Sequence, residues 1–357
     1  MPTAPRALAR PPASSVTIEL PRRASLVLRI AHPLSYATLR LGMNAIVALV
    51  GRGIPFRDAR NFHLSGLLDP LAALLLPPRG TVRRSMLFDR FPAEWVWQRD
   101  MPDPTQVKDS AILYFHGGGF VACGLNSHRR LVARIGRASG MPVFNVGYRQ
   151  LPKARLAETI ADCVESYEWL LSQGFPPERI VFAGDSVGGG LTFGLALAAR
   201  ERGLPMPGAI VAIAPWADYD STRRVAHPND RRDPMISAAA LALPVRLGML
   251  VDGVLDPKWS PVNHQFTGLP PVLIQVGSTE VLLADAEALA ERCAEAGVTC
   301  TMQVWDKGIH VFQVAADLLP DARQAIGEIG AFNQRTLNGS VQRPSAKRRF
   351  TRRTRVA

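Results

Sequence analysis

The stretch that decides the fold reads Arg179-Ile-Val-Phe-Ala-Gly-Asp-Ser-Val-Gly188. A short apolar run ends here in the pattern Gly-x-Ser-x-Gly and continues into a segment rich in Leu and Ala. When this pattern joins a strand to a helix, the sharp turn strains the serine and lifts its hydroxyl above the edge of the sheet. Glycine is required at positions 184 and 188, because a side chain there would collide with the facing strand and helix. The alternative is an ordinary glycine-rich turn, but this position in the chain favours Ser186 as a nucleophile.

Around this stretch, short apolar runs alternate with helical segments. Short buried strands that alternate with helices indicate a mainly parallel sheet covered by helices on both faces. We therefore predict an α/β fold whose site lies beyond the carboxyl ends of the strands. The expected strands are 86–88, 93–99, 111–115, 143–146, 179–183, 209–214, 272–276 and 300–305, and the expected helices include 157–171 and 285–296.

A second glycine motif, His116-Gly-Gly-Gly119, ends the strand expected at 111–115. Consecutive glycines let backbone N–H groups point closely at a developing oxyanion. Gly117 and Gly118 would supply two such donors, and the amide of Val187, next to the serine, would supply a third. A flexible loop and a phosphate cradle are the alternatives. We favour the oxyanion hole, because the motif lacks the Lys-Ser/Thr ending of a P-loop and no Gly-x-Gly-x-x-Gly with a downstream acid accompanies it.

A serine hydroxyl needs a base to become a good nucleophile, and the base needs an orienting carboxylate. In this fold the chain order is serine, acid, histidine. Three histidines follow the serine. His310 comes directly after the strand expected at 300–305, where a base above the sheet edge should lie, whereas His227 and His264 lie in or beside an insertion. We therefore predict His310 as the base and the other two as surface or cap residues.

Two acids compete for the orienting role. Glu280 lies in the loop after the strand expected at 272–276, and Asp285 lies five residues later, inside an expected helix. A negative charge in the first turn of a helix suits the helix dipole, which gives Asp285 another explanation. Loop placement therefore favours Glu280. Activity should then rise with pH through an apparent pKa of about 6.5, as His310 loses its proton.

These motifs resemble those of the hormone-sensitive-lipase-like branch of the α/β-hydrolases, the bacterial family IV esterases. Besides the two glycine motifs, the resemblance rests on Tyr148-Arg149, Leu269-Pro-Pro-Val-Leu-Ile274, Gly277-Ser-Thr-Glu280 and Gly308-Ile-His310-Val-Phe312, and it covers about residues 85–335. It implies hydrolysis of carboxylic esters with short to medium acyl chains, without a metal or a cofactor. The chain departs from the family in two places. The usual acid is Asp rather than Glu, and Gln-Leu-Pro-Lys follows Tyr148-Arg149 where Leu-Ala-Pro-Glu is usual.

The chain is expected to have three parts. Residues 1–80 should hold a leader, mobile up to about residue 23, and cap helices. Residues 81–340 should form the α/β-hydrolase catalytic domain, and residues 341–357 a basic, disordered tail. An insertion at 221–262 is longer than a connection within one sheet requires, so we expect it to complete the cap.

Residues 34–50 carry an apolar stripe at helical spacing. Such a stripe buries against a domain face, a substrate's acyl chain or a membrane surface. We favour packing in the core or the cap, because amphipathic patterns are common in single sequences. The apolar stretch Leu41–Gly51 has 11 residues, which is too short to span a bilayer. The stripe consists of Tyr36, Leu39, Met43, Ile46, Val47 and Val50.

The formal net charge of +12 comes from the two ends of the chain. Residues 341–357 carry seven Lys/Arg and no acid, and residues 1–60 carry nine arginines against two acids, so residues 61–340 carry −2. A nearly neutral middle argues against specific nucleic-acid binding. Weak contact with an anionic membrane through the basic ends and the cap is the most that we expect of the charge. The expected partner is a small-molecule or lipid ester, and the oligomeric state stays open.

Four cysteines in so long a chain do not form a disulfide scaffold, and their spacing is not that of a metal site. The start of the chain lacks the pattern of a secretory signal. We therefore expect free thiols and a cytoplasmic protein that is at most peripheral to a membrane. The cysteines are Cys123, Cys163, Cys293 and Cys300.

Two other functions fit the same sequence. A non-catalytic ligand-binding protein on a hydrolase scaffold is disfavoured, because the serine, an acid and the histidine are all present. A lactone or amide hydrolase of the same fold would use the same residues, and the sequence does not distinguish it from an esterase.

Overall fold

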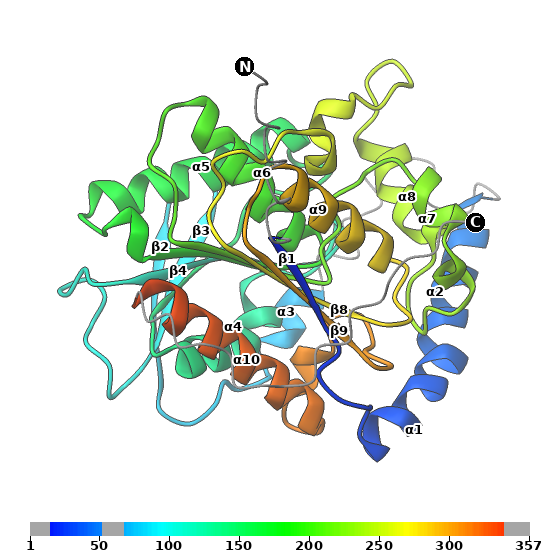
Figure 1. Cartoon of the computed structure of the whole chain (residues 1–357), viewed down its shortest axis with the longest axis horizontal. Helices are drawn as coiled ribbons and strands as arrows, with labels where there is room; N and C mark the ends of the chain where they lie inside the picture. Colours follow the sequence, from blue (N-terminus) through cyan, green and yellow to red (C-terminus); the bar gives the residue numbers. More distant parts are fainter. Residues whose placement is uncertain (1–14, 52–67, 339–357) are drawn as a thin grey trace, which may run out of the picture.

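A nine-stranded sheet runs through the centre of the computed structural model, which describes residues 15–51 and 68–338 (Figure 1). The strand order is β1-β9-β8-β7-β6-β4-β5-β3-β2. All neighbouring strands are parallel except the pairs β2–β3 and β3–β5, which confirms the predicted, mainly parallel α/β fold. The strands are β1 (Val16–Glu19), β2 (Thr81–Leu87), β3 (Pro92–Gln98), β4 (Ala111–Phe115), β5 (Val143–Val146), β6 (Ile180–Asp185), β7 (Ala209–Ile213), β8 (Val272–Gly277) and β9 (Cys300–Trp305).

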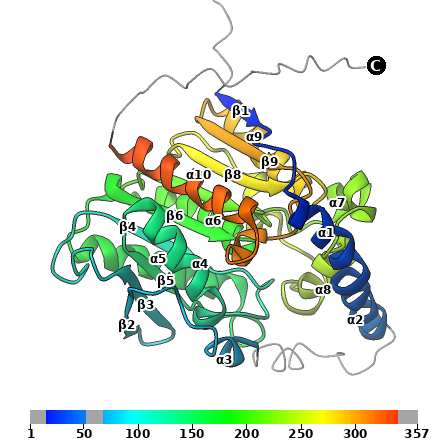
Figure 2. The same cartoon turned by 90° about the horizontal axis from the view of Figure 1, so that it is seen from below.

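Helices cover both faces of the sheet, so its strands are buried on both sides (Figures 1 and 2). Successive side chains of a strand point to opposite faces. In β4, Leu113 and Phe115 belong to the core shared with α5, α6 and α9, whereas Ile112 and Tyr114 belong to the core shared with α4 and α10. Burial on both faces explains why the strands read as uninterrupted apolar runs. The covering helices are α4 (Leu125–Ser139), α5 (Leu156–Ser172), α6 (Val187–Glu201), α9 (Leu283–Glu295) and α10 (Pro320–Leu337).

The N-terminal part is more ordered than the sequence suggested. The expected mobile leader was wrong in extent, because Val16–Glu19 forms β1 and pairs with β9 at one edge of the sheet. Gln303 Nε2 also donates a hydrogen bond to Glu19 Oε2 at 2.9 Å, which ties the two strands together through their side chains. Residues 1–14 of that leader and the basic tail at 341–357 lie outside the described residues.

One long helix and the insertion lie together on one side of the molecule (Figure 2). The helix is continuous through α1 (Leu26–Ser35), the π-helical turn η1 (Tyr36–Arg40) and α2 (Leu41–Gly51). The insertion contains α7 (Thr222–Ala226), α8 (Ala238–Gly248) and the short 3-10 turns η4 (Pro228–Arg231), η5 (Pro257–Trp259) and η6 (Pro261–Asn263). Helix α2 packs against α8. The short helix α3 (Leu68–Ala72) packs against α4 instead.

Arg40 anchors the long helix to the insertion. Its side chain is buried, and its guanidinium donates hydrogen bonds to the backbone carbonyls of Asp230, Asp233 and Ile236. Burying a guanidinium is tolerated only where such acceptors replace its water. The long helix and the insertion are therefore held together by polar contacts as well as by packing.

The outer side of the long helix faces solvent, contrary to the expected packing of the apolar stripe. Of that stripe only Val50 is buried, while Tyr36, Leu39 and Ile46 are 40%, 48% and 46% exposed. Leu28 and Arg40 face the domain instead.

The helix is also longer than the 11-residue stretch Leu41–Gly51 that the sequence analysis considered too short to span a bilayer. The helix at residues 26–50 is long and apolar enough to cross a membrane, by length and composition, and little of it is buried.

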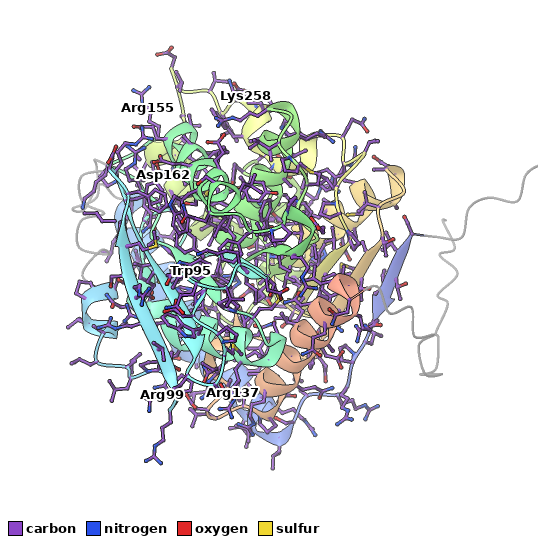
Figure 3. The ribbon with its side chains drawn as sticks, turned by 90° about the vertical axis from the view of Figure 1, so that its left-hand side faces the viewer. Trp95, Arg99, Arg137, Arg155, Asp162 and Lys258 are labelled. Carbon is purple, nitrogen blue, oxygen red and sulfur yellow. The ribbon has the colours of Figure 1, made fainter. Side chains whose placement is uncertain are left out.

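The opposite end of the molecule is closed by an aromatic core under β2 and β3. Trp95 of β3 is fully buried, and its ring centroid lies 4.9 Å from that of Phe144 and 5.5 Å from that of Phe175. Figure 3 views the molecule from this end, with Trp95 in the interior and Arg99 and Arg137 near the lower rim. This end therefore lies far from the long helix, which Figure 1 shows on the other side.

Candidate active site

Ser186 lies at the turn between β6 and α6, as predicted. Its backbone angles, φ 53° and ψ −122°, are strained for a residue with a side chain. The turn is held by two hydrogen bonds: the Ser186 N–H donates to the Ile213 carbonyl at 2.8 Å, and its carbonyl accepts from Trp216 N–H at 2.9 Å. This is the conformation expected of a nucleophile raised above a sheet edge.

The two flanking glycines have the packing role that the sequence predicted. A Cβ at Gly184 would lie 2.4 Å from the Gly188 carbonyl oxygen, and a Cβ at Gly188 would lie 2.0 Å from the Phe115 carbonyl oxygen. Both oxygens belong to the backbone, so neither can move away cheaply. Glycine is therefore required at both positions by the close approach of β4, β6 and α6.

The structure brings Glu280 and His310 together. Glu280 follows β8 and His310 follows β9, so both side chains emerge at the carboxyl ends of neighbouring parallel strands. His310 Nδ1 lies 2.8 Å from Glu280 Oε2, and Glu280 Oε1 accepts a 2.7 Å hydrogen bond from Gly277 N–H. Both residues are almost completely buried, at 9% and 1% exposure. The carboxylate is therefore fixed by the backbone and can fix the imidazole in turn.

Ser186 lies at the same edge of the sheet, at the end of β6. Its exposure is 5%, so it is covered to a similar degree as His310. Within residues 15–51 and 68–338, neither Ser186 Oγ nor His310 Nε2 makes a hydrogen bond. Catalytic hydrogen bonds are often long without substrate and tighten in the complex.

The pKa of His310 is raised above its usual 6.5. Burial opposes the imidazolium and is the largest single influence, but the hydrogen bond that His310 donates to Glu280 and the negative charge of Glu280 outweigh it. Asp233 and Asp185 add smaller contributions in the same direction. The imidazole therefore holds its proton to a higher pH than the sequence suggested.

Asp233, in the insertion, is a residue that the sequence analysis missed. Its Oδ2 accepts from Val281 N–H at 2.7 Å, and its Oδ1 accepts from Met235 N–H and Ile236 N–H at 2.7 and 2.8 Å. Burial, followed by the nearby charge of Glu280, raises the pKa of Asp233 to about 6. The one sequence signal was its position before Pro234, which marks a turn but reveals nothing of Val281.

The His-Gly-Gly-Gly loop lies against the serine turn. A Cβ at Gly117 would lie 2.3 Å from Asp185 Oδ2 and 3.1 Å from the Ser186 Cβ, so the loop backbone packs directly against the side chains of the serine turn. Gly118 has φ +121°, and a Cβ there would lie 1.9 Å from the Ala122 carbonyl oxygen. The loop therefore needs glycine both for its conformation and for its contact with the serine. Val187, the third predicted donor, opens helix α6, where a backbone N–H has no partner within the helix.

His128 was also missed, and it decides how Gly117 is used. His128 Nε2 lies 3.3 Å from Gly117 N and 3.1 Å from Asp185 Oδ2. The amide of Gly117 can only donate, so Nε2 is the acceptor of this hydrogen bond, and Asp185 lies beside the same nitrogen. Burial disfavours the imidazolium, but the charge and hydrogen bond of Asp185 raise the pKa of His128. The Gly117 N–H is directed at the His128 ring in this structure, so this predicted oxyanion donor is already engaged.

His116 and Tyr148, both quoted in the sequence motifs, support the loop from behind. Their rings stack with centroids 4.4 Å apart. Tyr148 donates its hydroxyl proton to the His116 carbonyl at 2.6 Å, and His116 Nδ1 lies 2.7 Å from the Gly117 carbonyl oxygen. Burial, with the charge of His128, lowers the pKa of His116 to about 4, so its imidazole is neutral at neutral pH and its Nδ1–H donates to Gly117. His116 therefore holds the loop in place through backbone carbonyl groups.

Asp285, the competing acid, is engaged elsewhere. It is fully buried and lies 3.0 Å from the guanidinium of Arg224, and it accepts from the Ala217 and Asp218 N–H groups at 3.0 and 2.8 Å. The sequence suggested that Asp285 interacts with the helix dipole, whereas the structure shows it bonded to named groups outside its own helix. It attaches α9 to the base of the insertion.

The other two histidines after the serine lie away from Glu280 and His310. His227 Nδ1 caps the turn at Asn229, and His264 Nε2 lies 2.7 Å from the Lys258 carbonyl oxygen. Among the residues that the structure describes, no group of three His, Cys, Asp or Glu side chains is arranged to hold a metal ion. The four cysteines are free thiols.

The motifs and geometry match known proteins along most of the chain. A family profile described as alpha/beta hydrolase fold matches residues 112–314. Esterase LipU of Mycobacterium tuberculosis is 38% identical over 273 residues, which are 75% of this chain and 91% of that protein. The carboxylesterase/phospholipase LipF of the same species is 37% identical over 295 residues, which are 80% of this chain and 78% of that protein.

Solved structures agree with these relatives. An esterase from the bacterial hormone-sensitive lipase family has 31% sequence identity and a TM-score of 0.70, over 83% of this chain and 98% of that chain. The chain therefore belongs to the hormone-sensitive-lipase-like branch of the α/β-hydrolases, the bacterial family IV esterases, and it is a hydrolase of the carboxylesterase and lipase class.

Proposed function

We propose that this esterase hydrolyses carboxylic esters of short to medium acyl chain through Ser186, His310 and Glu280, with an oxyanion hole formed by the His-Gly-Gly-Gly loop. The observation that carries the proposal is the buried 2.8 Å contact between His310 Nδ1 and Glu280 Oε2. A buried carboxylate in this position fixes the imidazole tautomer with Nε2 free to accept a proton. The strained serine on the same sheet edge supplies the nucleophile.

In the acylation step, Ser186 Oγ attacks the carbonyl carbon of the ester while His310 Nε2 takes the hydroxyl proton. The carbonyl oxygen becomes an oxyanion and accepts hydrogen bonds from the backbone N–H groups of Gly118 and Val187, and from that of Gly117 once it has turned away from His128 Nε2. When the tetrahedral intermediate collapses, the bond to the alcohol breaks and His310 returns the proton to the leaving alkoxide. Glu280 stabilises the imidazolium throughout and does not itself take the proton.

Deacylation reverses these roles with water as the nucleophile. His310 removes a proton from water, which attacks the acyl-enzyme carbonyl, and the same donors stabilise the second oxyanion. The bond to Ser186 Oγ then breaks, the serine regains its proton from His310, and the carboxylic acid leaves. The cycle consumes one water for each ester.

The substrate class follows from the same site. One relative is named an esterase and the other a carboxylesterase/phospholipase, and enzymes of these kinds hydrolyse ester bonds. We infer short to medium acyl groups from the resemblance to the family. A lactone or amide would use the same residues, so these substrates belong in the test.

A panel of p-nitrophenyl esters from C2 to C16, with a lactone and an anilide, tests this assignment. We expect the highest kcat/KM among the short and medium esters. Ser186→Ala should lower kcat by about four or more powers of ten, because the covalent step is lost. If the purified Ser186→Ala protein retains most of its ester turnover, another residue is the nucleophile. Highest activity on the C16 ester would refute the chain-length assignment alone.

A further inference from the structure

The long helix carries an unusual number of exposed apolar side chains. Nine large ones between residues 26 and 49 are each at least 40% exposed. Exposed apolar surface of this extent on one element marks an interaction site. The most exposed members of the helix are Leu26, Ile30, Leu34 and Leu41, at 70%, 61%, 62% and 57%.

The inner side of the same helix is bonded to the domain along its length. Near its start, Ser25 N–H donates to Asp321 at 3.0 Å, and in its second turn His32 Nε2 lies 2.8 Å from Thr279 Oγ1. Arg40 follows with its three carbonyl contacts to the insertion. A membrane-spanning arrangement would have to break these contacts and expose the Arg40 guanidinium to lipid, which is costly. The helix therefore fits a position parallel to a membrane surface, with its outer side in contact with lipid.

The charge around the helix identifies the kind of surface. Arg22, Arg23 and Arg29 are exposed, and none of them forms an ion pair with another described residue. No Asp or Glu occurs between residues 20 and 57 of the sequence. The same segment of a second copy would offer these arginines no acidic side chain, whereas an anionic lipid surface would attract them.

We propose that the outer side of the helix at residues 26–51 docks on an anionic lipid surface, with Arg22, Arg23 and Arg29 on the headgroups. The helix is about 39 Å long at 1.5 Å per residue, and the contacts along its inner side keep it parallel to the surface. Thr279, which contacts His32, is next to Glu280 in the chain. Docking therefore places the loops of Glu280 and His310 beside the membrane. Binding itself does not require the catalytic residues.

Vesicle flotation with the full chain tests this proposal. Vesicles of phosphatidylcholine alone are compared with vesicles of phosphatidylcholine and phosphatidylglycerol in a 7:3 ratio, at low and high salt. We expect binding to the anionic vesicles at low salt and a loss of most of it at high salt, because charge attraction is screened. Ser186→Ala should bind as the unchanged protein does, which separates this result from the proposed catalytic role.

Two double variants separate the apolar and charged contributions. Ile30→Gln with Leu34→Gln removes apolar contact without adding charge, and it should weaken the apparent affinity by about tenfold or more. Arg22→Gln with Arg23→Gln should weaken binding to anionic vesicles by roughly tenfold at low salt. The matched controls are Leu87→Gln, at the end of β2 where the side chain is 83% exposed, and Arg99→Gln, directly after β3. Both strands lie at the opposite end of the molecule from the long helix (Figure 1). The controls should change affinity by less than about twofold.

Three results would overturn the proposal. One is a lack of binding to either kind of vesicle. Another is unchanged binding of the Ile30→Gln/Leu34→Gln variant, which would assign the attraction to another basic segment. The third is a dimer in solution without lipid that this variant dissociates, which would make the helix an interface between two copies. Circular dichroism and the unfolding temperature check that each variant is folded.

Discussion

The catalytic edge of the sheet and the long N-terminal helix use their side chains in opposite ways. At the sheet edge, Glu280 and His310 are buried, hydrogen-bonded and held by backbone loops that approach each other closely. On the helix, leucine and isoleucine side chains are exposed to solvent, while the opposite side of the same helix is bonded to the domain. Catalytic geometry depends on particular residues at particular positions, so it can be recognised as a sequence motif. An exposed apolar surface appears in the sequence only as a hydrophobic pattern, which does not identify the partner that binds there.

After loss of the nucleophile itself, the largest effect is expected where the sheet edge loses its orienting charge. Glu280→Gln should lower kcat by about two to four powers of ten, because the imidazole loses both its tautomer control and the partner of its imidazolium. His310 must be neutral to accept a proton, so activity rises with pH through its pKa. Burial lowers that pKa, but the hydrogen bond to Glu280 and its charge outweigh burial and raise it. The rise in activity should therefore lie above pH 6.5 in the unchanged enzyme and at lower pH in Glu280→Gln.

Stopped-flow or steady-state rates from pH 5 to 9 measure this difference. Glu280→Asp is the matched control, because it keeps the charge and shortens the side chain. An unchanged pH profile in Glu280→Gln would mean that another group sets the ionisation of the base.

Substitutions on the two sides of the long helix should change the free energy of unfolding by different amounts. Leu28 is fully buried, so Leu28→Ala should lower the free energy of unfolding by about 2 to 5 kcal/mol through lost burial and a cavity. Ile30, two residues later, is 61% exposed, and Ile30→Gln should change it by no more than about 0.5 kcal/mol. Urea denaturation of both variants measures the difference. Equal losses would show that the outer side is covered by another part of the chain.

The smallest effect is expected at the contact between the insertion and the acid loop. Burial is the largest influence on the pKa of His310 and lowers it; Glu280 raises that pKa, and Asp233 raises it by less than Glu280 does. Asp233→Asn keeps an oxygen acceptor but removes the charge, so the pH at which activity is half-maximal should move down by less than in Glu280→Gln. The pH profile of kcat/KM checks this order. A larger shift than that of Glu280→Gln would reverse the ranking of the two acids.

The sequence predicted the centre of the fold well because burial on both faces leaves uninterrupted apolar runs. The strands at 111–115, 143–146 and 300–305 have the expected bounds. Strand β1 was missed because it is a short edge strand, and Ile18 in it is 61% exposed. Helices α4 and α10 were also not predicted, although both contribute to the core on one face of the sheet.

The candidate site was predictable to the extent that each residue lies in a local motif. Ser186, Glu280 and His310 were each found from the element that precedes them. Asp233 and His128 were not, because their roles depend on contacts with segments 48 and 57 residues away in the chain. No local pattern in one sequence encodes such contacts.

Trapping of the acyl-enzyme tests the central claim most directly. The enzyme is mixed with p-nitrophenyl butyrate, quenched in acid within the first turnover, digested and analysed by mass spectrometry. The account predicts a butyryl group on the peptide that contains Ser186, and its absence in Ser186→Ala. A butyryl group on another residue, or rapid turnover of Ser186→Ala with no change in rate, would contradict it.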